Sequence, residues 1–537
     1  MEEAWYRNAI FYSLDVETFH DGNGDGIGDF AGLTEKLEYL HGLGIDCLWL
    51  LPFYPSPNRD NGYDVMDYYN VDSRLGSLGD FAQFLNKAER LGIRVLIDLV
   101  LNHTSVKHPW FQAARRSPED PHHDYYVWSP KPLPHDKSEL MFQGEEERVW
   151  TWDKKARKYY LHRFYREQPD LNIAHGPVRA EILKIMAFWL RLGVHGFRID
   201  ATQALIETYG LKGFTRKQGL QFIGELQAFA RGRRADVLLL AEVNAGVGEM
   251  NTFLEGGRLH MLFNFYLNQH LFLALATGRR TALERALDRL PALPPNQQWL
   301  QFLRHHDELN LRLLKPEERD RVFSVFAPEE DMRIYGFGIR RRLVPLFGGP
   351  GRWVQLAYSL LFSMPGAPLL RYGDEIGMGE QLRLPGRASV RTPMQWSDAP
   401  KGGFSDGAGR TVAPVVARGP YGFVQVNVAR SQQDPGSLLN WLERLISTRK
   451  QCPEIGNGRY FKRVAADRAL LLHGFEGAKR RLLFLHNLSP EPVLATWKEL
   501  GFRAGEATGL FADGAADDDP DGIRVAGHGF RWLSIHH

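Results

Sequence analysis

The sequence predicts a parallel β/α barrel of eight strands with a small all-β domain behind it. Apolar, strand-like runs alternate with segments of helical periodicity from the start of the chain, which is typical of a parallel sheet covered by helices. Four of these runs end in an acidic or polar cluster, at residues 98–103, 196–201, 240–244 and 302–307. Because the carboxyl ends of barrel strands meet at one face, we expect the clusters to share one pocket.

The elements follow in order. The first run is β-rich, and the segment behind it carries Leu33, Leu37 and Leu40 at helical spacing. The expected helices cover residues 33–43, 81–91, 178–192 and 438–449. The expected strands are residues 9–16, 45–51, 94–101, 194–199, 237–241, 261–265, 299–303 and 368–371. Eight strands are what a closed barrel of this kind needs.

Two stretches interrupt the alternation. Residues 104–174 are rich in Pro, His, Asp, Tyr and Trp and show no clear helix, and residues 308–350 form a second irregular segment. Such segments inside a compact fold are usually functional loops or small inserted domains. Short strands near residues 469–473 and 481–485 indicate a C-terminal antiparallel β-sandwich. We expect a barrel of residues 1–103 and 175–454 with a lid-like insert at 308–350, an inserted domain at 104–174 and a β domain at 455–537.

The composition and net charge limit the classes of partner that are expected. The chain has 537 residues, of which 44% are hydrophobic and 24% charged, and its formal net charge is +2, so nothing favours a nucleic acid or an acidic membrane. The two cysteines, Cys47 and Cys452, imply no disulfide framework. The N-terminus lacks a signal-peptide pattern, and no apolar stretch is long enough to span a membrane. We expect a cytoplasmic enzyme without an organic cofactor, and we leave open whether it forms a homo-oligomer.

Asp200 is the candidate nucleophile of a glycosidic reaction. It ends a predicted strand, so its side chain is expected at the barrel mouth, and Arg198 lies two residues earlier on the same strand face. A guanidinium beside a carboxylate lowers the carboxyl pKa and keeps it ionised, as a nucleophile requires. A structural Arg–Asp pair is the alternative.

The other strand ends supply partners for this carboxylate. Glu242 follows an apolar run, and an apolar surround raises a carboxyl pKa, which suits a general acid. Asp307 could hold substrate hydroxyls, and His103 could hydrogen-bond a sugar. Each residue alone has a structural explanation, but carboxylates gathered in one pocket suggest glycoside chemistry.

Two oxygen-rich sites are candidates for calcium. Asp21, Asn23, Asp25, Ile27 and Asp29 alternate with glycines in the manner of the first half of an EF-hand loop, although no Glu stands at the twelfth position. A Gly-Asp turn is the alternative. Asn102 and Asp170 could form another oxygen site where the insert meets the barrel.

Asp64 and Arg391 are polar residues in loops that follow the second and eighth expected strands. If they meet, the pair would close one end of the pocket. Surface ion pairs are common, so spacing alone does not support this contact.

The four clusters resemble the four signature regions of the α-amylase family, glycoside hydrolase family 13. Residues 168–172 resemble a fifth region of its oligo-1,6-glucosidase-type branch. The likeness is closer still to the branch that interconverts maltose and trehalose. It covers most of residues 4–450 and runs through residues 5–9, 50–57, 108–112, 124–129, 338–343, 372–379, 391–396 and 427–428.

The resemblance implies a role for each matching residue. Asp200 would be the nucleophile, Glu242 the acid/base and Asp307 the carboxylate that stabilises the transition state. The substrate glucose would be bound by Tyr63, Asp64, His103, Arg198, His306 and Arg391. Structural calcium, one or two ions, would be held by Asn102, Asp170, Ala204, Leu205 and Glu207, and by the loop from Asp21 to Asp29.

The implied reaction is a retaining double displacement through a glucosyl-enzyme on Asp200, in which the freed glucose turns and attacks again. The inserts at 104–174 and 308–350 would then act as lids that exclude water. Departures from the family pattern at His195, residues 202–206, Val243 and His305 are expected to surround the second glucose. The alternative is therefore an α-glucosidase or transglucosidase acting on small α-glucosides such as maltose, trehalose or sucrose.

Overall fold

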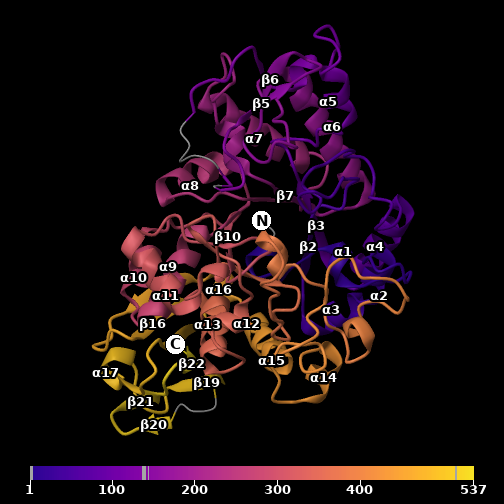
Figure 1. Cartoon of the computed structure of the whole chain (residues 1–537). Coiled ribbons are helices and arrows are strands. Elements are labelled where there is room, and N and C mark those ends of the chain that lie inside the picture. Colours follow the sequence, from indigo (N-terminus) through magenta and orange to yellow (C-terminus); the bar gives the residue numbers. More distant parts are fainter. Residues whose placement is uncertain (1–3, 136–140, 143, 514–516, 537) are drawn as a thin grey trace.

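The protein is described here from a computed structural model, which covers residues 4–135, 141–142, 144–513 and 517–536. Eight parallel strands close into a barrel in the order β1-β14-β10-β9-β8-β7-β3-β2 (Figure 1). They are β1 (Phe11–Leu14), β2 (Cys47–Leu50), β3 (Arg94–Leu99), β7 (Gly196–Ile199), β8 (Leu238–Ala241), β9 (Met261–Phe263), β10 (Gln298–Phe302) and β14 (Ala367–Arg371). Each lies within or overlaps one of the eight predicted runs, so the predicted barrel is confirmed.

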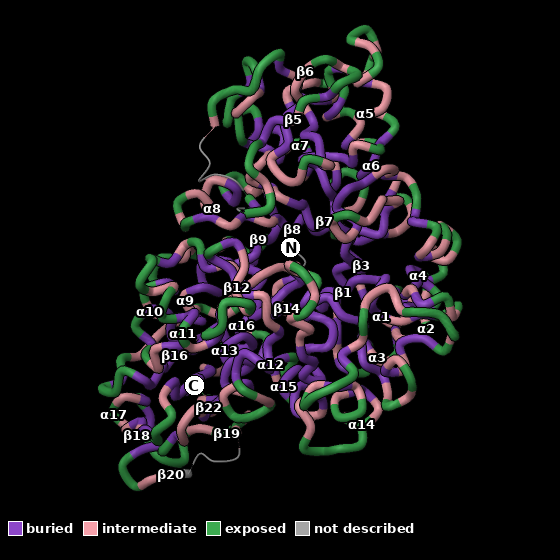
Figure 2. Tube along the Cα trace, in the orientation of Figure 1, coloured by how far each residue is buried: buried purple, intermediate pink, exposed green. Residues whose placement is uncertain are grey.

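The barrel strands are mostly apolar because both of their faces are covered. Figure 2 shows the strands as the buried centre of the molecule. Leu48 and Leu239, on β2 and β8, are 0% exposed. Continuous apolar runs are the usual signature of parallel strands that carry helices on the outside.

The barrel helices begin and end at recognisable caps. The predicted helix at 33–43 is split at Lys36 into α2 (Phe30–Glu35) and α3 (Leu37–Leu43). The side chain of Asp29 caps α2, and Gly44 ends α3 in the left-handed conformation. The other predicted helices are present as α4 (Leu78–Arg90), α6 (Gly176–Leu192) and α15 (Leu438–Lys450).

The remaining helices of the barrel domain connect or cover the strands. They are α1 (Val16–Phe19), α7 (Arg216–Arg231), α8 (Val247–Leu254), α9 (Phe265–Thr277), α10 (Thr281–Arg289), α13 (Arg352–Ser363), α14 (Val428–Gln433) and α16 (Glu454–Asn457). The described residues contain no helix long and apolar enough to cross a membrane.

The first insert is more regular than predicted. It folds into a three-stranded antiparallel sheet of β4 (Trp128–Ser129), β6 (Lys158–Leu161) and β5 (Trp150–Asp153), at the end of the molecule drawn uppermost in Figure 1. The expectation of no helix is wrong, because α5 (Pro109–Ala114) starts with a proline in its first turn behind the capping His108.

The second insert is not irregular either. It contains α11 (Pro316–Phe326), the short α12 (Leu343–Leu346) and a three-stranded antiparallel sheet. The strands of this sheet are β11 (Leu309–Asn310), β13 (Gly338–Ile339) and β12 (Arg333–Ile334).

The C-terminal region is all-β apart from α17 (Trp497–Leu500), as predicted. A five-stranded antiparallel sheet contains β15 (Arg459–Arg463), β16 (Leu470–Glu476), β17 (Arg480–Asn487), β22 (Phe530–His536) and β19 (Ala507–Ala512). A second sheet contains β18 (Val493–Thr496), β21 (Gly522–Val525) and β20 (Asp517–Asp519). Leu472, Leu483 and Ile523 share an apolar core between the two sheets. The domain limits 1–103, 104–174, 175–454 and 455–537 stay predictions.

Candidate active site

A cavity of about 740 Å³ opens at the carboxyl ends of the barrel strands. Side chains of β7, β8 and β10, or of the loops that follow them, line it together with residues of both inserts. The predicted residues Tyr63, His103, Asp200, Glu242 and Asp307 all lie on its wall. The expectation that these strand ends share one pocket is therefore met.

The Arg198 guanidinium binds three carboxyl groups at the floor of this cavity. Nη1 of Arg198 contacts Oδ1 of Asp98 and Oδ1 of Asp200, each at 2.5 Å. Nη2 donates to Oε2 of Glu242 at 2.7 Å. Arg198 is buried and lies over the ring of Trp49, so its position is fixed by packing as well as by charge.

Burial decides the charge state of the two predicted catalytic carboxyls. It raises the pKa of Glu242 to about 7, and Arg198 offsets part of the rise. This direction agrees with the expectation for a general acid. Burial also raises the pKa of Asp200, with Arg198 again opposing it. Arg198 lowers this pKa as expected, but the expectation of a net lowering is wrong, because desolvation of Asp200 is the larger effect.

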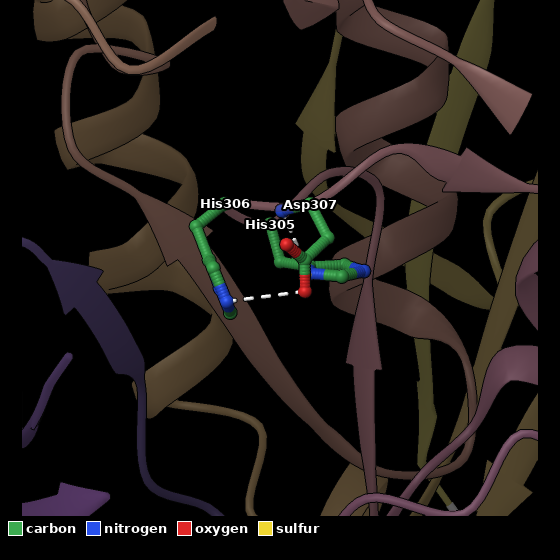
Figure 3. Close-up of side chains that lie close together, drawn as sticks. All are labelled: His305, His306 and Asp307. Carbon is green, nitrogen blue, oxygen red and sulfur yellow. Dashed lines mark hydrogen bonds and ion pairs between the residues drawn. The ribbon is translucent and has the colours of Figure 1, made fainter. Parts of the chain in front are cut away.

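Asp307 is held by opposite charges. Oδ1 is contacted by Nη1 of Arg387 at 2.5 Å and Nη2 of Arg391 at 2.7 Å, and Oδ2 lies 3.1 Å from Nε2 of His306 (Figure 3). Burial raises the pKa of this carboxyl, but Arg387, His306 and Arg391 hold it well below the ordinary value. Asp307 is thus an anion, which suits a residue that faces developing positive charge.

An aromatic wall adjoins Asp307. The Tyr63 hydroxyl lies 2.9 Å from Nε2 of His306, and the two rings are stacked with centroids 5.6 Å apart. Nε2 of His103 lies 3.2 Å from the Tyr63 carbonyl oxygen. These contacts fix the ring of Tyr63 beside the reacting centre, where a sugar ring could stack on it.

Asp64 and Arg391, whose meeting the sequence left open, form no ion pair in the described part of the chain. Asp64 is fully buried and accepts hydrogen bonds from Ser56 and from the backbone N–H groups of Arg59 and Asp60. Neither Asp64 nor Arg391 lines the cavity, whereas Asp60 and Arg387 do and pair with each other at 3.0 Å. The Asp64 carboxylate forms its hydrogen bonds within its own loop, so the Asp60–Arg387 pair lines this end of the pocket instead.

The loop from Asp21 to Asp29 wraps around its own carboxylates. Asp21 accepts hydrogen bonds from the backbone of Asn23, Gly24 and Gly26, and Asn23 and Asp25 accept from the second residue after each. Carboxylate and amide oxygens are donor types that suit calcium. Among the described residues, however, the carboxylate oxygens of Asp21, Asp25 and Asp29 are not gathered within 4.8 Å of one another.

The second predicted calcium site brings its side chains together around an arginine. Nδ2 of Asn102 lies 3.1 Å from Oδ1 of the fully buried Asp170. Arg163 pairs with Oδ2 of Asp170 and, through Nε, lies 3.4 Å from Glu207. The carbonyl oxygen of Ala204 accepts a hydrogen bond from the Glu207 N–H, and Leu205 is buried beside it. The oxygen donors are of the right kind for calcium, and Arg163 neutralises part of their charge.

A third cluster does not suit a metal. Among the described residues, His305, His306 and Asp307 form the one group of three or more His, Cys, Asp or Glu side chains whose ligand atoms all lie within 4.8 Å (Figure 3). Arg387 and Arg391 already bind Asp307 there, so a cation would meet two guanidiniums.

The sequence reasoning missed three residues of the site. Asp98 lies inside the apolar strand β3, and this isolated charge within a buried strand was the available signal. Asp60 and Arg387 lie in loops, where no periodicity marks them. Four of the departures from the family pattern line the cavity, namely Gln203, Ala204, Ile206 and His305, whereas His195, Thr202, Leu205 and Val243 do not. His195 precedes β7 at the opposite end of the barrel, where its Nδ1 accepts a hydrogen bond from the Val95 N–H.

The sequence is similar to a protein family and to several characterised proteins. The sequence profile described as "Alpha amylase, catalytic domain" matches residues 16–458. The chain is 38% identical to a "Trehalose synthase" of Pimelobacter sp., covering 99% of this chain and 96% of that protein. It is also 38% identical to "Trehalose synthase/amylase TreS" of Mycolicibacterium smegmatis, over 99% of this chain and 92% of that protein.

Solved structures agree with the fold. An α-glucosyl transfer enzyme, XgtA, superposes with a TM-score of 0.80 at 27% identity, covering 100% of both chains. A mutant of the trehalulose synthase MutB bound to Tris superposes with a TM-score of 0.79 at 25% identity, covering 99% of this chain and 100% of that one.

Proposed function

This chain belongs to the α-amylase family, and we propose that it interconverts maltose and trehalose by moving a glucosyl group within one pocket. The observation that carries the proposal is the pair of contacts from Arg198 to Asp200 and Glu242 on the cavity floor. Two carboxyls held on one guanidinium, with different environments, suit a nucleophile and an acid/base.

In the first half-reaction a carboxylate oxygen of Asp200 attacks the anomeric carbon of the bound glucose. The bond from that carbon to the bridging oxygen breaks, and Glu242 gives its proton to this oxygen. Asp307, held as an anion, faces the positive charge that develops on the sugar ring. In a retaining enzyme the two reacting carboxyls would lie about 5–5.5 Å apart.

In the second half-reaction the freed glucose turns in the pocket. Its own anomeric hydroxyl attacks the glucosyl-enzyme, its proton passes to Glu242, and the bond to Asp200 breaks. The product is trehalose when the substrate was maltose. The same steps in reverse convert trehalose to maltose, provided that water stays out.

Hydrolysis of small α-glucosides is the second candidate. One relative is named both trehalose synthase and amylase, and His305, Gln203 and Ala204 line the cavity where a second glucose would lie. The partition between glucose and water is a small difference, since about 1.4 kcal/mol changes a rate ratio tenfold.

Calcium is proposed as a structural ion only. The loop of Asp21, Asn23, Asp25, Ile27 and Asp29 would hold one ion, and Asn102, Asp170, Glu207 and the carbonyls of Ala204 and Leu205 a second. When bound, the ion would stabilise a loop or the junction of insert and barrel. A cytoplasmic location also stays a prediction.

The proposal is tested by NMR of the products formed from maltose and, separately, from trehalose. Each sugar should give the other with little free glucose, and Asp200→Asn should abolish both conversions. Mostly free glucose from either sugar would instead identify a hydrolase, and no reaction with either would contradict both candidates.

A further inference from the structure

The chain that leaves the catalytic floor after Asp307 runs along the cavity wall as an extended segment. Glu308, Asn310 and Arg312 line the cavity, whereas Leu309 and Leu311 between them are 1% and 0% exposed. Successive side chains of an extended strand point to opposite faces, so this alternation directs the polar residues to the pocket. Glu308, Asn310 and Arg312 are called the acceptor edge below.

The backbone of the acceptor edge is held in place by the second insert. Its strand β11 pairs antiparallel with β13, with Leu309 opposite Ile339 and Asn310 opposite Gly338. Gly338 lies directly against Glu308, because a Cβ built on this glycine would lie 2.5 Å from Cγ of Glu308. Nδ2 of Asn310 in turn donates to Oε1 of Glu308 at 3.3 Å.

Arg312 differs from the other arginines that line the cavity. Arg163, Arg216 and Arg387 each pair with a carboxylate, at Asp170, Glu249 and Asp60 respectively. Among the described residues, the Arg312 guanidinium has no carboxylate within 4.0 Å and no hydrogen-bond partner; it lies 4.2 Å from the ring centroid of Phe337. Its N–H donors are therefore free, and the ring fixes the plane in which they lie.

The position of Arg312 separates it from the reacting sugar. Arg312 lies in the turn that follows β11 and is exposed to solvent, whereas Asp200 and Arg198 at the floor are buried, so Arg312 lies toward the cavity mouth. Under the proposed function, the glucose that reacts would be bound on the floor beside Asp200, Tyr63 and Asp307, which line the cavity there. The acceptor edge therefore faces the second sugar of a disaccharide.

We infer that Arg312 is a specificity-determining residue that binds hydroxyl groups of the released glucose and keeps this glucose in the pocket while it turns. The inference rests on the proposed function. Asn310 and Glu308 provide further hydrogen-bonding groups on the same edge, so the sugar can change its orientation without leaving. Loss of this contact lets the glucose escape, and water then takes the glucosyl group.

The test compares Arg312→Ala with Arg312→Lys, and uses Arg321→Ala, an exposed arginine on α11 of the same insert, as the control. NMR gives the ratio of isomerised sugar to free glucose from maltose. Hydrolysis of p-nitrophenyl α-glucoside measures the activity of the catalytic residues without a second sugar, because its leaving group carries no sugar hydroxyls.

For Arg312→Ala the ratio should fall roughly tenfold or more, the size expected for losing a hydrogen bond to a charged group. Hydrolysis of the p-nitrophenyl substrate should change far less, Arg312→Lys should recover part of the ratio, and the control should match the wild type. A ratio that stays unchanged, or that falls in parallel with p-nitrophenyl hydrolysis, overturns the inference.

If the wild type makes only free glucose, the proposed function is contradicted, whatever the role of Arg312. The inference is then tested by transfer from p-nitrophenyl α-glucoside to added glucose. In that assay Arg312→Ala should raise the KM for glucose roughly tenfold. An unchanged KM would overturn it.

Discussion

Arg198 donates from Nη2 to Oε2 of Glu242 at 2.7 Å. The other terminal nitrogen of the same guanidinium holds Asp200 and Asp98. One buried cation thus meets the buried carboxyls of Asp98 and Asp200 and the partly buried carboxyl of Glu242, and the position of each depends on the others.

Asp98 is a positioning residue in this arrangement. Replacing it by Asn should free one side of Arg198 and misplace both reacting carboxyls. We expect kcat on p-nitrophenyl α-glucoside to fall roughly 10²-fold, the cost of misplacing a group by about 1 Å. The exposed Asp124→Asn serves as control. A folded Asp98→Asn enzyme of wild-type kcat would contradict this role.

The pH profile of kcat/KM should be bell-shaped. Glu242 must be protonated to act as an acid, and burial raises its pKa to about 7, so activity should fall as pH rises through about 7. Asp200 must be ionised, and burial raises its pKa too, so the acid limb should lie above the ordinary carboxyl range. Glu242→Gln should remove the alkaline limb with a p-nitrophenyl substrate, whose leaving group needs no proton. A profile flat from pH 6 to 9 would disprove the assignment of Glu242.

Arg387 links Asp307 to Asp60 across the pocket. Arg387→Met removes the charge that does most to keep the pKa of Asp307 low, so part of Asp307 should become protonated at mildly acidic pH. We expect KM to rise roughly tenfold, and the acid limb to move to higher pH. Arg383→Met, an exposed arginine in the same loop, is the control. Equal profiles for both variants would show that Arg391 suffices.

The C-terminal domain carries a buried, acid-sensitive histidine pair. His473 and His486 lie 5.2 Å apart between ring centroids, and Nε2 of His486 lies 2.9 Å from Oγ of Ser359 on α13. Burial lowers the pKa of His473 to about 3, below the ordinary 6.5. The folded state therefore keeps it neutral, and stability is lost as pH falls from about 6.5 toward 3, by about 1.4 kcal/mol per pH unit and proton.

This dependence is checked by thermal unfolding at pH 7.5 and 5. The drop in Tm should be smaller in His473→Leu than in the wild type, because one fewer buried group gains a proton on unfolding. The exposed His41→Leu should keep the wild-type drop. Identical drops in all three proteins would rule out a contribution of His473.

Removal of metal tests the calcium proposal. Chelation should lower Tm, and added calcium should restore it. At a calcium concentration 100 times the dissociation constant, binding adds about 2.7 kcal/mol to the free energy of unfolding. Asp170→Asn should weaken this response, since it removes a buried carboxylate. A Tm indifferent to chelator, with no calcium found by elemental analysis, would mean that Arg163 alone neutralises Asp170 and Glu207.

The sequence predicted the barrel well because its strands are buried on both faces and are therefore mostly apolar. Within the inserts it failed. Short helices such as α5 depend on a local cap at His108 rather than on a long periodic pattern. Site residues at strand ends, such as Asp200 and Glu242, could be found because topology brings strand ends together. Asp60 and Arg387 could not, since only the folded loops bring together residues 327 positions apart. Whether Asp64 meets Arg391 was left open by the sequence for the same reason.

The central claim is that the glucosyl group moves to the same glucose that was released. The most direct measurement is conversion of unlabelled maltose in the presence of excess ¹³C-glucose, followed by NMR of the trehalose formed. If the released glucose stays in the pocket, the trehalose formed should be almost free of label. Trehalose labelled in proportion to the added glucose would contradict it, because the released sugar would then have left the pocket before the second attack.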